Sequence, residues 1–536
     1  MNSIWNKNFE AFRKRFPALA QITGDKPVSP ESVWTLEQAR NGSITASEGG
    51  VRLHSAYNPE REANGAVNRD EVFEKSSVVF YGFGLGYHII EFAKLAAERA
   101  SQKGSVAPRL ILIEPDISHF YASLCILDWT PVFALENLII AVGCPAESVL
   151  PLLEDVSKVN VGETGVSDSY FFDIPSFTSH AKAYFDTVRS LVKRNQRKNE
   201  INAATLKKFG RLWCRNSIKN INQLEKRAGI NALENKLNAK LPFLLLGAGP
   251  SLETIIPYIS ELNERTITVC VETALHTLLR AGLQPDFILL TDPQFWAYRH
   301  IAGLRAPESI LITEVSAYPS VFRFDCKKIL LCASQFPVGQ YFEQKLDIRP
   351  GDLGTGGSVA SCAWNFAHFC GAKEIFTAGL DLAFPDKQTH IKGSSAEQTY
   401  HTISSRLSAS DKFTAASLYS ANAVAGIDYN GKQVLTDSRM KMFSWWFESR
   451  LAACPETKTY TLCPQGLAVP GIQKAEISEL LARPKQKELK QDFIAFAAAL
   501  PPLAATPKAH GDLTKLLADF PSQDFLTTYP FLKEYL

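Results

Sequence analysis

The segment Leu241–Leu262 (LPFLLLGAGPSLETIIPYISEL) constrains the fold of this chain most strongly. Its apolar run Phe243–Leu246 is short and ends at glycine, which is typical of a strand buried on both faces of a parallel sheet. Residues 247–251 (GAGPS) then lead into a helix-like pattern. Glycine permits a tight turn and a close backbone approach, and proline fits the first turn of a helix. The pattern therefore predicts a strand-to-helix turn, which either is purely structural or binds a phosphate through its free N–H groups.

Polar residues follow several predicted strands downstream. These strands are Thr266–Val271 before Glu272 and Thr273, Phe287–Leu290 before Asp292 and Gln294, Ser309–Ile312, Ile329–Cys332, and Glu374–Ala378 before Asp381. A glycine segment, 354–358 (GTGGS), opens a predicted helix that ends near Cys370. Because ligands of open α/β sheets bind beyond the carboxyl ends of the strands, this order predicts a nucleotide site. Its predicted binding residues are Gly247, Gly249, Pro250, Ser251, Leu252, Glu272, Thr273, Asp292, Gln294, Thr355, Gly356, Gly357 and Ser358.

These blocks resemble the motility-associated-factor (Maf-type) glycosyltransferases of bacterial flagellin. In the centre of the chain, the resemblance is carried by GAGPSL, PDFILLTDPQ, GTGGSVASCAWNFAHFCGAKEIFTAGLDLAF and the following Thr389-His390. Before the centre it is carried by SAYNPEREA and VVFYGFGLGYHI…LILIEPD, and after it by VLTDSRMKMFSWWFE and the Gly466…Pro470-Gly471 stretch. The central domain is also similar to bacterial sialyltransferases that use CMP-activated sugars, and to archaeal pterin pyrophosphokinases. Since one fold supports several reactions, these resemblances leave the chemistry open.

The Maf resemblance implies transfer of a nonulosonic acid (sialic, pseudaminic or legionaminic type) from a CMP donor to Ser/Thr of flagellin. The leaving phosphate would then be held by the N–H groups of 249–252 and 356–358, with the hydroxyls of Ser251, Thr355 and Ser358. These residues could instead only cap helices. His390 is the candidate base, with His401 as the alternative, because an imidazole accepts a proton near neutral pH. His390 could also be a surface residue without a role, and Asp381 either contacts the substrate or orders a lid.

Length and pattern predict an α/β protein of several domains. We expect a smaller Rossmann-like domain at 1–180, a helical connector at 181–240, a central nucleotide-sugar-binding glycosyltransferase domain at 241–422 and a mostly helical domain at 423–536. In the first domain, the strand Ser77–Tyr81 precedes GFGLG, and Glu114 ends the next strand. This pattern is shared by nucleotide-binding and purely structural Rossmann-like domains, and we favour the structural reading. Pro385–Arg406 is expected to be a lid over the strand ends.

Composition excludes some partners. The chain has 57 Lys and Arg against 55 Asp and Glu, which argues against a dedicated nucleic-acid binder. It shows no signal-peptide pattern and no apolar stretch of membrane-spanning length, so we expect a cytoplasmic protein with no membrane partner. The ten cysteines include no C-x-x-C pair and the ten histidines show no ligand-like spacing, so we expect no disulfide and no metal site. No tightly bound cofactor is expected.

Two other functions remain open. One is a diphosphotransferase similar to the pterin group, which would need ATP and Mg²⁺. The other is a non-catalytic protein that binds flagellin. A D-x-D signature is absent around Asp381, since Gly379 and Ala383 occupy the two positions concerned, so we expect transfer without a metal. The sequence leaves the particular sugar, the acceptor positions, the stereochemical outcome, any ligand of the N-terminal domain and the oligomeric state open.

Overall fold

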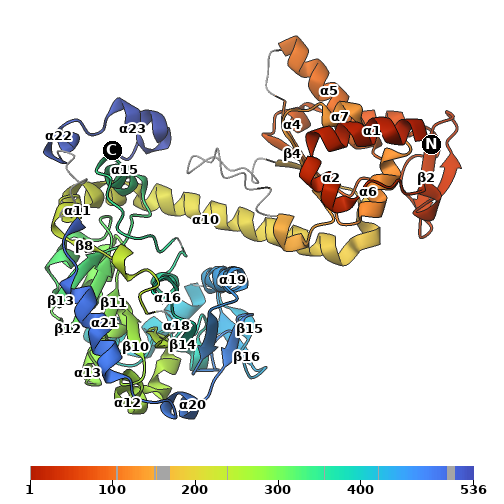
Figure 1. The fold of residues 1–536 in the computed structure, drawn as a ribbon. Helices are drawn as coiled ribbons and strands as arrows, with labels where there is room; N and C mark the ends of the chain where they lie inside the picture. Colours follow the sequence, from red (N-terminus) through yellow and green to blue (C-terminus); the bar gives the residue numbers. More distant parts are fainter. Residues whose placement is uncertain are drawn as a thin grey trace. The chain divides into compact units, whose positions relative to one another are not determined.

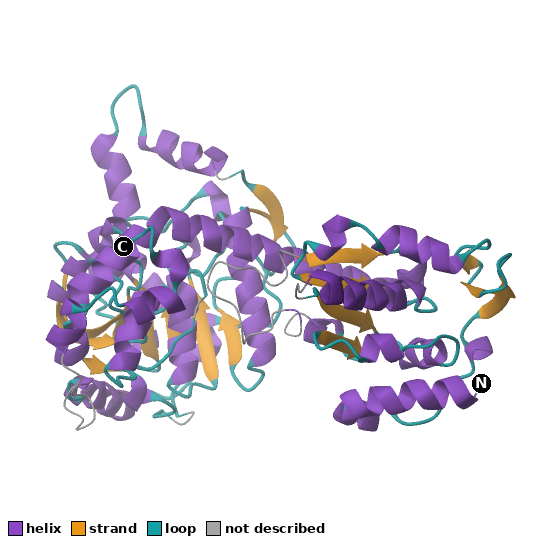
Figure 2. Cartoon of the chain, turned by 90° about the horizontal axis from the view of Figure 1, so that it is seen from above, coloured by secondary structure: helices purple, strands orange, loops and turns teal. Residues whose placement is uncertain are grey.

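The computed structural model describes residues 2–103, 107–149, 153, 169–237, 240–354, 356–420, 422–503 and 513–536. It divides into two compact units, Met1–Thr205 and Leu206–Leu536 (Figure 1). Each unit contains a parallel sheet with helices packed around it, as Figure 2 shows. The predicted α/β fold class is therefore confirmed. Among the described residues, no helix is long and apolar enough to cross a membrane.

The first unit has a four-stranded parallel sheet with the order β6-β5-β4-β7 and a three-stranded antiparallel sheet, β1-β2-β3, within the described residues. Its strands are β1 Thr35–Gln38, β2 Ile44–Glu48, β3 Val51–Arg52, β4 Ser77–Tyr81, β5 Arg109–Glu114, β6 Leu138–Val142 and β7 Ser169–Asp173. Its helices are α1 Asn2–Arg15, α2 Pro17–Thr23, η1 Pro30–Ser32, α3 Pro59–Val67, α4 Asp70–Phe73, α5 Tyr87–Lys103, α6 Ile117–Leu124, α7 Thr130–Phe133, η2 Ala146–Ser148, α9 Pro175–Thr178 and η3 Ser179–Ala181. The strands β4 and β5 coincide closely with those predicted from the sequence.

The second unit is built on a parallel sheet with the order β18-β17-β14-β9-β10-β11-β12-β13-β8. Its strands are β8 Ala228–Gly229, β9 Phe243–Leu246, β10 Ile267–Val271, β11 Phe287–Leu289, β12 Arg305–Thr313, β13 Asp325–Leu331, β14 Glu374–Ala378, β17 Lys458–Thr461 and β18 Ile472–Lys474, with the separate hairpin β15 Val424–Ile427 and β16 Gln433–Thr436. The α-helices are α10 Lys182–Asn220 (which crosses the unit boundary), α11 Gln223–Lys226, α12 Ile259–Asn263, α13 Glu272–Arg280, α14 Phe295–Ile301, α15 Pro337–Lys345, α16 Val359–Phe369, α17 Ser395–Ile403, α18 Ser410–Ser420, α19 Ser438–Ala453, α20 Ile477–Leu481, α21 Lys487–Ala499, α22 Leu513–Ala518 and α23 Gln523–Thr528. The 3-10 helices are η4 Asn231–Leu233, η5 Pro250–Thr254, η6 Ile256–Tyr258, η7 Pro319–Arg323, η8 Pro385–Lys387 and η10 Pro530–Leu532.

The segment expected to form a separate, mostly helical domain at 423–536 instead belongs to this unit. Its strand β17 pairs in parallel with β14, and β18 pairs with β17. Likewise β8, from the expected connector 181–240, pairs with β13. Unpaired strand edges expose backbone hydrogen-bonding groups, so these late and early strands complete the sheet that the central strands begin. The predicted boundaries therefore do not coincide with those of the two units.

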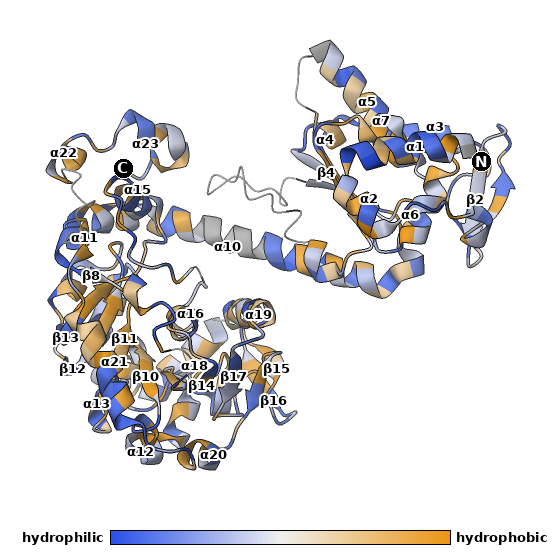
Figure 3. Cartoon of the chain, viewed as in Figure 1, coloured by the Kyte–Doolittle hydropathy of each residue, from blue (hydrophilic) through white to orange (hydrophobic). Residues whose placement is uncertain are grey.

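The central sheet is buried on both faces, as the apolar run after Leu241 predicts. All four residues of β9 are fully buried. Leu244 and Leu246 pack in the core with η5, α12 and α13, while Phe243 and Leu245 pack in the core with α16 and α19. Figure 3 shows the same hydrophobic colouring along β10 and β11. The sheet therefore has one apolar layer on each side.

A buried ion pair joins α21 to the sheet. The Lys490 ammonium lies 2.7 Å from Asp286 Oδ2 and donates to the carbonyl oxygens of Asn263 and Thr266 at 2.7 and 3.0 Å. Asp286 in turn accepts a hydrogen bond from the backbone N–H of Thr268 at 2.7 Å. Because both charged side chains are almost fully buried, each one depends on the other for compensation. The C-terminal segment is thus part of the structural core.

Candidate functional site

The strand order reverses between β9 and β14. From β9 the chain adds β10, β11, β12 and β13 on one side, and then returns to place β14 on the other side of β9. Ligands of open α/β sheets bind outside the carboxyl ends of the strands at such a switch point. The predicted residues 247–252 leave β9 at this point, and Asp381 follows β14. The topology therefore brings these two predicted segments together.

The two glycines after β9 lie against the segment after β14. The N–H of Gly247 donates to the carbonyl of Ala378 at 2.8 Å, and that of Gly249 donates to Gly379 at 2.9 Å. A Cβ atom on Gly247 would lie 2.4 Å from the Gly379 oxygen, and one on Gly249 would lie 2.4 Å from Asp381 Oδ2. Glycine is therefore required here by a close approach within the protein, whereas the sequence suggested the approach of a ligand.

Ser251 is bonded to Asp381. Its backbone N–H donates to Asp381 Oδ2 at 2.9 Å and its hydroxyl donates to Oδ1. Burial raises the pKa of Asp381 to about 6, although the two hydrogen bonds from Ser251 oppose this rise. The N–H of Leu252 bonds to the carbonyl of Gly249 at 3.1 Å, and Pro250 has no N–H. An anionic carboxylate thus occupies the two donors of Ser251, which are among the donors predicted to hold a phosphate.

The C-terminal segment also contacts this turn. A Cβ on Gly466 would lie 2.6 Å from the Asp381 carbonyl oxygen, and the N–H of Leu467 donates to that oxygen at 2.7 Å. The Cys463 thiol donates to the Ser251 carbonyl at 3.3 Å. Sequence reasoning did not place Cys463 at the site, although Gly466 opens one of the blocks that resemble the Maf proteins. The glycine in that block is the sequence signal that could have indicated this close contact.

Glu272 and Asp292 come together at the ends of β10 and β11. Glu272 is the first residue of α13, is 6% exposed, and its Oε2 has no hydrogen-bond partner in the described structure. Desolvation raises the pKa of Glu272 to about 8, and the charge of Asp292 adds to this rise. Burial also raises the pKa of Asp292, which accepts a hydrogen bond from the N–H of Gln294 at 2.8 Å. Glu272 therefore keeps its proton at pH 7 and lies near a second acidic side chain, that of Asp292. Thr273 is half-buried beside them.

A further carboxylate, Glu314, follows β12 and was missed by the sequence reasoning. Its side chain is buried, and it accepts a hydrogen bond from the N–H of Gln335 at 3.1 Å. Burial raises its pKa, and hydrogen bonds from Ser334 and Ser316 oppose the rise. The rule that selected Glu272, a polar residue directly after a buried strand, would have found Glu314 as well. The carboxyl edge of the sheet therefore carries more acidic groups than expected.

The glycine segment at 354–358 builds a helix cap. Ser358 is the N-cap of α16, and the side chains and N–H groups of Ser358 and Ser361 are reciprocally bonded as a capping box. Gly357 has a φ of 73°, which favours glycine. A Cβ on Gly356 would lie 1.9 Å from Ser361 Oγ. These residues have the capping role that was considered beside phosphate binding. Thr355 lies outside the described residues.

The expected lid packs on the turn. The N–H of Ile391 donates to the carbonyl of Ala248 at 2.9 Å, and Ile391 is buried. His390, next to it, is exposed. Desolvation by the surrounding protein and the charge of Arg439 lower the pKa of its imidazole. The ring is therefore neutral at pH 7 and able to accept a proton. His401, in α17, is 63% exposed.

A pocket of about 420 Å³ lies between α16 and α19. Asn365, His368, Trp446 and Arg450 line it, and the Arg450 guanidinium donates to Asn365 Oδ1 at 3.0 Å. None of the described predicted site residues lines this pocket. It is therefore distinct from the place where the segments after β9 and β14 meet.

Comparison with known proteins gives one domain match and one fold match. Residues 53–138 match the model described as the glycosyltransferase Maf N-terminal domain. The solved Maf glycosyltransferase of Magnetospirillum magneticum AMB-1 has the same fold, with a TM-score of 0.59 and 16% identity over 94% of this chain and 79% of that chain. Residues 53–138 thus resemble a Maf N-terminal domain, and the chain has the fold of a Maf glycosyltransferase.

Other comparisons match parts of this chain. Residues 215–387 match the model of 6-hydroxymethylpterin diphosphokinase MptE-like proteins. Two relatives from Treponema pallidum, both named uncharacterized proteins, are 34% identical over 230 residues and 30% identical over 274 residues. These matches cover 38% and 48% of this chain, and 58% and 85% of the relatives. The chain thus spans little more than half of the first relative.

In the Maf N-terminal domain of this chain, protein atoms fill the space around the glycine loop after β4. A Cβ on Gly82 would lie 2.2 Å from the Phe177 carbonyl oxygen, and one on Gly86 would lie 2.5 Å from the Trp129 ring. Glu114, which ends β5, lies 2.8 Å from His180 Nε2. This arrangement supports the structural interpretation of the domain.

Proposed function

We propose that this chain is a glycosyltransferase that moves a nonulosonic acid from a CMP donor to a Ser/Thr hydroxyl of flagellin, in the cytoplasm and without a metal. The observation that carries the proposal is the contact between the segments after β9 and β14, where an anionic carboxylate already occupies the donors of Ser251. Those donors suit an anion, and the phosphate of CMP is one. The resemblance to CMP-dependent sialyltransferases supplies the donor class.

In the proposed reaction the bond between the sugar's anomeric carbon and the phosphate oxygen breaks, and CMP leaves with that electron pair. The phosphate takes the place of the Asp381 carboxylate on Ser251, so that the hydrogen bonds strengthen as negative charge grows. The acceptor hydroxyl oxygen forms the new glycosidic bond, and His390 takes its proton. The segment with Ile391 keeps water from the activated sugar.

The acidic pair at β10 and β11 suits the ribose and base of the same donor. A carboxyl group that is neutral at pH 7, as the pKa of about 8 makes Glu272, donates a hydrogen bond without repelling the phosphate. Asp292 accepts hydrogen bonds from ribose hydroxyls or from the amino group of cytosine. Gln294 and Thr273 extend this surface. The helix cap at Ser358 orders the segment beside it.

Calorimetry of the full chain with CMP tests the proposal. We expect saturable CMP binding that Ser251→Trp abolishes, because the indole occupies the space beside the turn at residue 251. Ser449→Trp, on the exposed side of α19, is the matched control and should bind CMP normally. Transfer from CMP-nonulosonates to purified flagellin then tests the reaction. Absence of CMP binding in the unmodified chain would overturn the donor assignment.

The MptE-like match at 215–387 favours one alternative, a diphosphotransferase. That activity requires ATP and Mg²⁺, so binding of ATP–Mg²⁺ with no binding of CMP would support it. Co-purification of flagellin without any sugar transfer would instead indicate a non-catalytic binding protein.

A further inference from the structure

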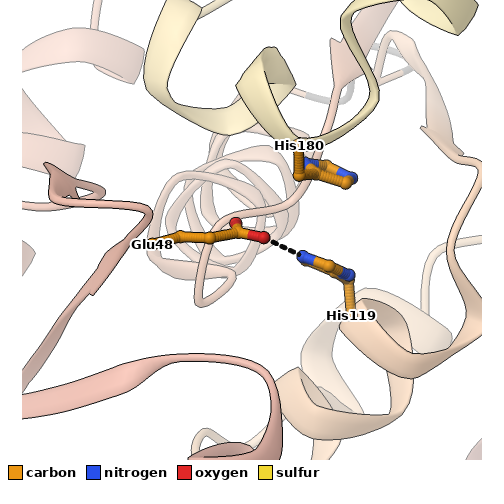
Figure 4. Close-up of side chains that lie close together, drawn as sticks. All are labelled: Glu48, His119 and His180. Atoms are coloured by element: carbon orange, nitrogen blue, oxygen red, sulfur yellow. Dashed lines mark hydrogen bonds and ion pairs between the residues drawn. The ribbon is translucent and has the colours of Figure 1, made fainter.

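Histidine and carboxylate side chains meet in the first unit, whereas the site described above belongs to the second unit. Glu48 ends β2, His119 lies in α6 and His180 lies in η3 (Figure 4). Ligand atoms of these three residues all lie within 4.8 Å of one another. Their side chains are 21%, 11% and 8% exposed, respectively. The cluster is therefore largely enclosed, with Glu48 as its most exposed member.

Each imidazole has a carboxylate at one nitrogen at least. His119 places Nε2 at 2.9 Å from Glu48 Oε1 and Nδ1 at 3.1 Å from Asp116 Oδ2. His180 places Nε2 at 2.8 Å from Glu114 Oε1. Metal-bound histidines usually have a carboxylate or carbonyl on the second nitrogen, which fixes the tautomer and the ring orientation. This leaves His119 Nε2, His180 Nδ1 and the Glu48 carboxylate as three ligand atoms.

The charge of the cluster favours a cation. The carboxylates of Glu48, Asp116 and Glu114 lie within 3.1 Å of the two imidazoles in a largely buried place. The two rings stack with centroids 4.0 Å apart and an angle of 16° between their planes. Stacking holds the two nitrogen ligands side by side. A divalent ion would balance the charge and use this arrangement.

We propose that the first unit binds one Zn²⁺ ion through Glu48, His119 and His180. Imidazole and carboxylate ligands suit zinc, and three protein ligands with water in the fourth position is an established arrangement for such sites. The ion would join β2, α6 and η3 at the carboxyl edge of β5. The sequence showed no metal-ligand spacing because these residues lie far apart in the chain. The zinc site lies in the first unit, whereas the proposed transferase site lies in the second. The zinc proposal therefore does not depend on the proposed transferase function.

Metal analysis of the full chain tests the proposal. After incubation with Zn²⁺ and gel filtration, we expect one equivalent of zinc per chain, and Co²⁺ in its place should give a d–d absorption spectrum of a site with nitrogen and oxygen ligands. His119→Ala should lose the metal. Glu48→Gln, at the most exposed ligand, should also lose it while the circular dichroism spectrum stays unchanged. Glu114→Gln, at an orienting partner, should keep the stoichiometry and weaken binding by about 10–100-fold.

Two control variants assign the ion. Glu62→Gln removes the carboxylate 3.7 Å from His54 Nδ1 in the same unit and should leave zinc binding unchanged. Cys454→Ser disrupts the His368–Cys454–Glu456 group of the other unit and should also leave it unchanged. Zinc retained by folded His119→Ala, zinc lost in Cys454→Ser, or less than about a tenth of an equivalent in the unmodified chain would overturn the proposal.

Discussion

Replacing Glu272 by glutamine should stabilise the second unit at neutral pH. Glu272 is buried at the end of β10, and one of its carboxyl oxygens has no hydrogen-bond partner among the described residues. In the folded chain, burial and the charge of Asp292 raise its pKa from 4.5 to about 8. The folded state must therefore keep a proton that the unfolded chain releases. Glutamine has nearly the same shape and never releases one.

The size of the effect follows from the two pKa values. A raised folded pKa leaves stability intact below the unfolded value of 4.5 and removes it as the pH rises towards 8. Each pH unit in this window costs about 1.4 kcal/mol, so the penalty at pH 7 is roughly 3 kcal/mol. Glu272→Gln should therefore raise the free energy of unfolding by roughly this amount at pH 7 and by almost nothing near pH 4. A glutamine amide N–H that lacks a hydrogen-bond partner would lower the free energy of unfolding of the variant by about 1–3 kcal/mol at every pH.

The diagnostic quantity is the pH dependence of the difference between the two proteins. Hydrogen exchange of peptides from β9 and β10 in rising urea reports on the second unit alone. Glu261→Gln, at a side chain that is 62% exposed, is the matched control and should show almost no pH-dependent difference. A difference for Glu272→Gln that is the same at pH 5 and pH 8 would refute the reasoning, because it would mean that Glu272 is ionised in the folded chain.

Three further predictions test the site and the core. His390→Ala should lower the rate of transfer to flagellin about 10²-fold or more and leave CMP binding intact, whereas His401→Ala should leave both unchanged; an unaltered rate for His390→Ala would exclude it as the base. Lys490→Met leaves the buried Asp286 charge without its partner, so urea denaturation should show a loss of about 3–5 kcal/mol, and unchanged stability would argue against the buried pair. Gly379→Ala places a Cβ 2.5 Å from the carbonyl oxygen of the facing turn at a φ of 69°, so calorimetry should show loss of CMP binding together with a lowered melting temperature, and normal binding would contradict the close contact.

The sequence predicts the strands of the second unit well where they are apolar. The runs at β9, β10 and β14 are hydrophobic and end at glycine or a polar residue, and the structure contains all three strands close to the predicted positions. By contrast, β17 (KTYT) and β18 (IQK), the last two strands on one side of the sheet, are short and largely polar. Hydrophobic periodicity does not detect such strands. The sequence therefore predicted a mostly helical C-terminal domain, because these two strands were not detected.

The same reasoning explains the outcome at the site. A strand-end rule finds Ser251 and Asp381, but it does not say that the two bond to each other, since 130 positions separate them in the chain. A glycine in the sequence indicates only that something approaches closely. At Gly249 that neighbour is the protein's own carboxylate. The histidines His119 and His180 meet for a related reason, because only the folded sheet brings α6 and η3 together.

These observations explain why the proposed transferase site, at the ends of β9 and β14, depends on the residues that follow β16. Asp381 can bond to Ser251 only if the backbone after β14 is fixed, and Gly466 with Leu467 fixes it from the segment that follows β17. The pairing of β17 with β14 places that segment, and Lys490 then joins α21 to the far side of the same sheet. Buried carboxylates with raised pKa values weaken the carboxyl edge of the sheet, and the strands β17 and β18 from the C-terminal residues extend the sheet beside β14. A chain ending near residue 422 would retain every residue predicted for donor binding and would still lack the contacts that hold Asp381 against the turn.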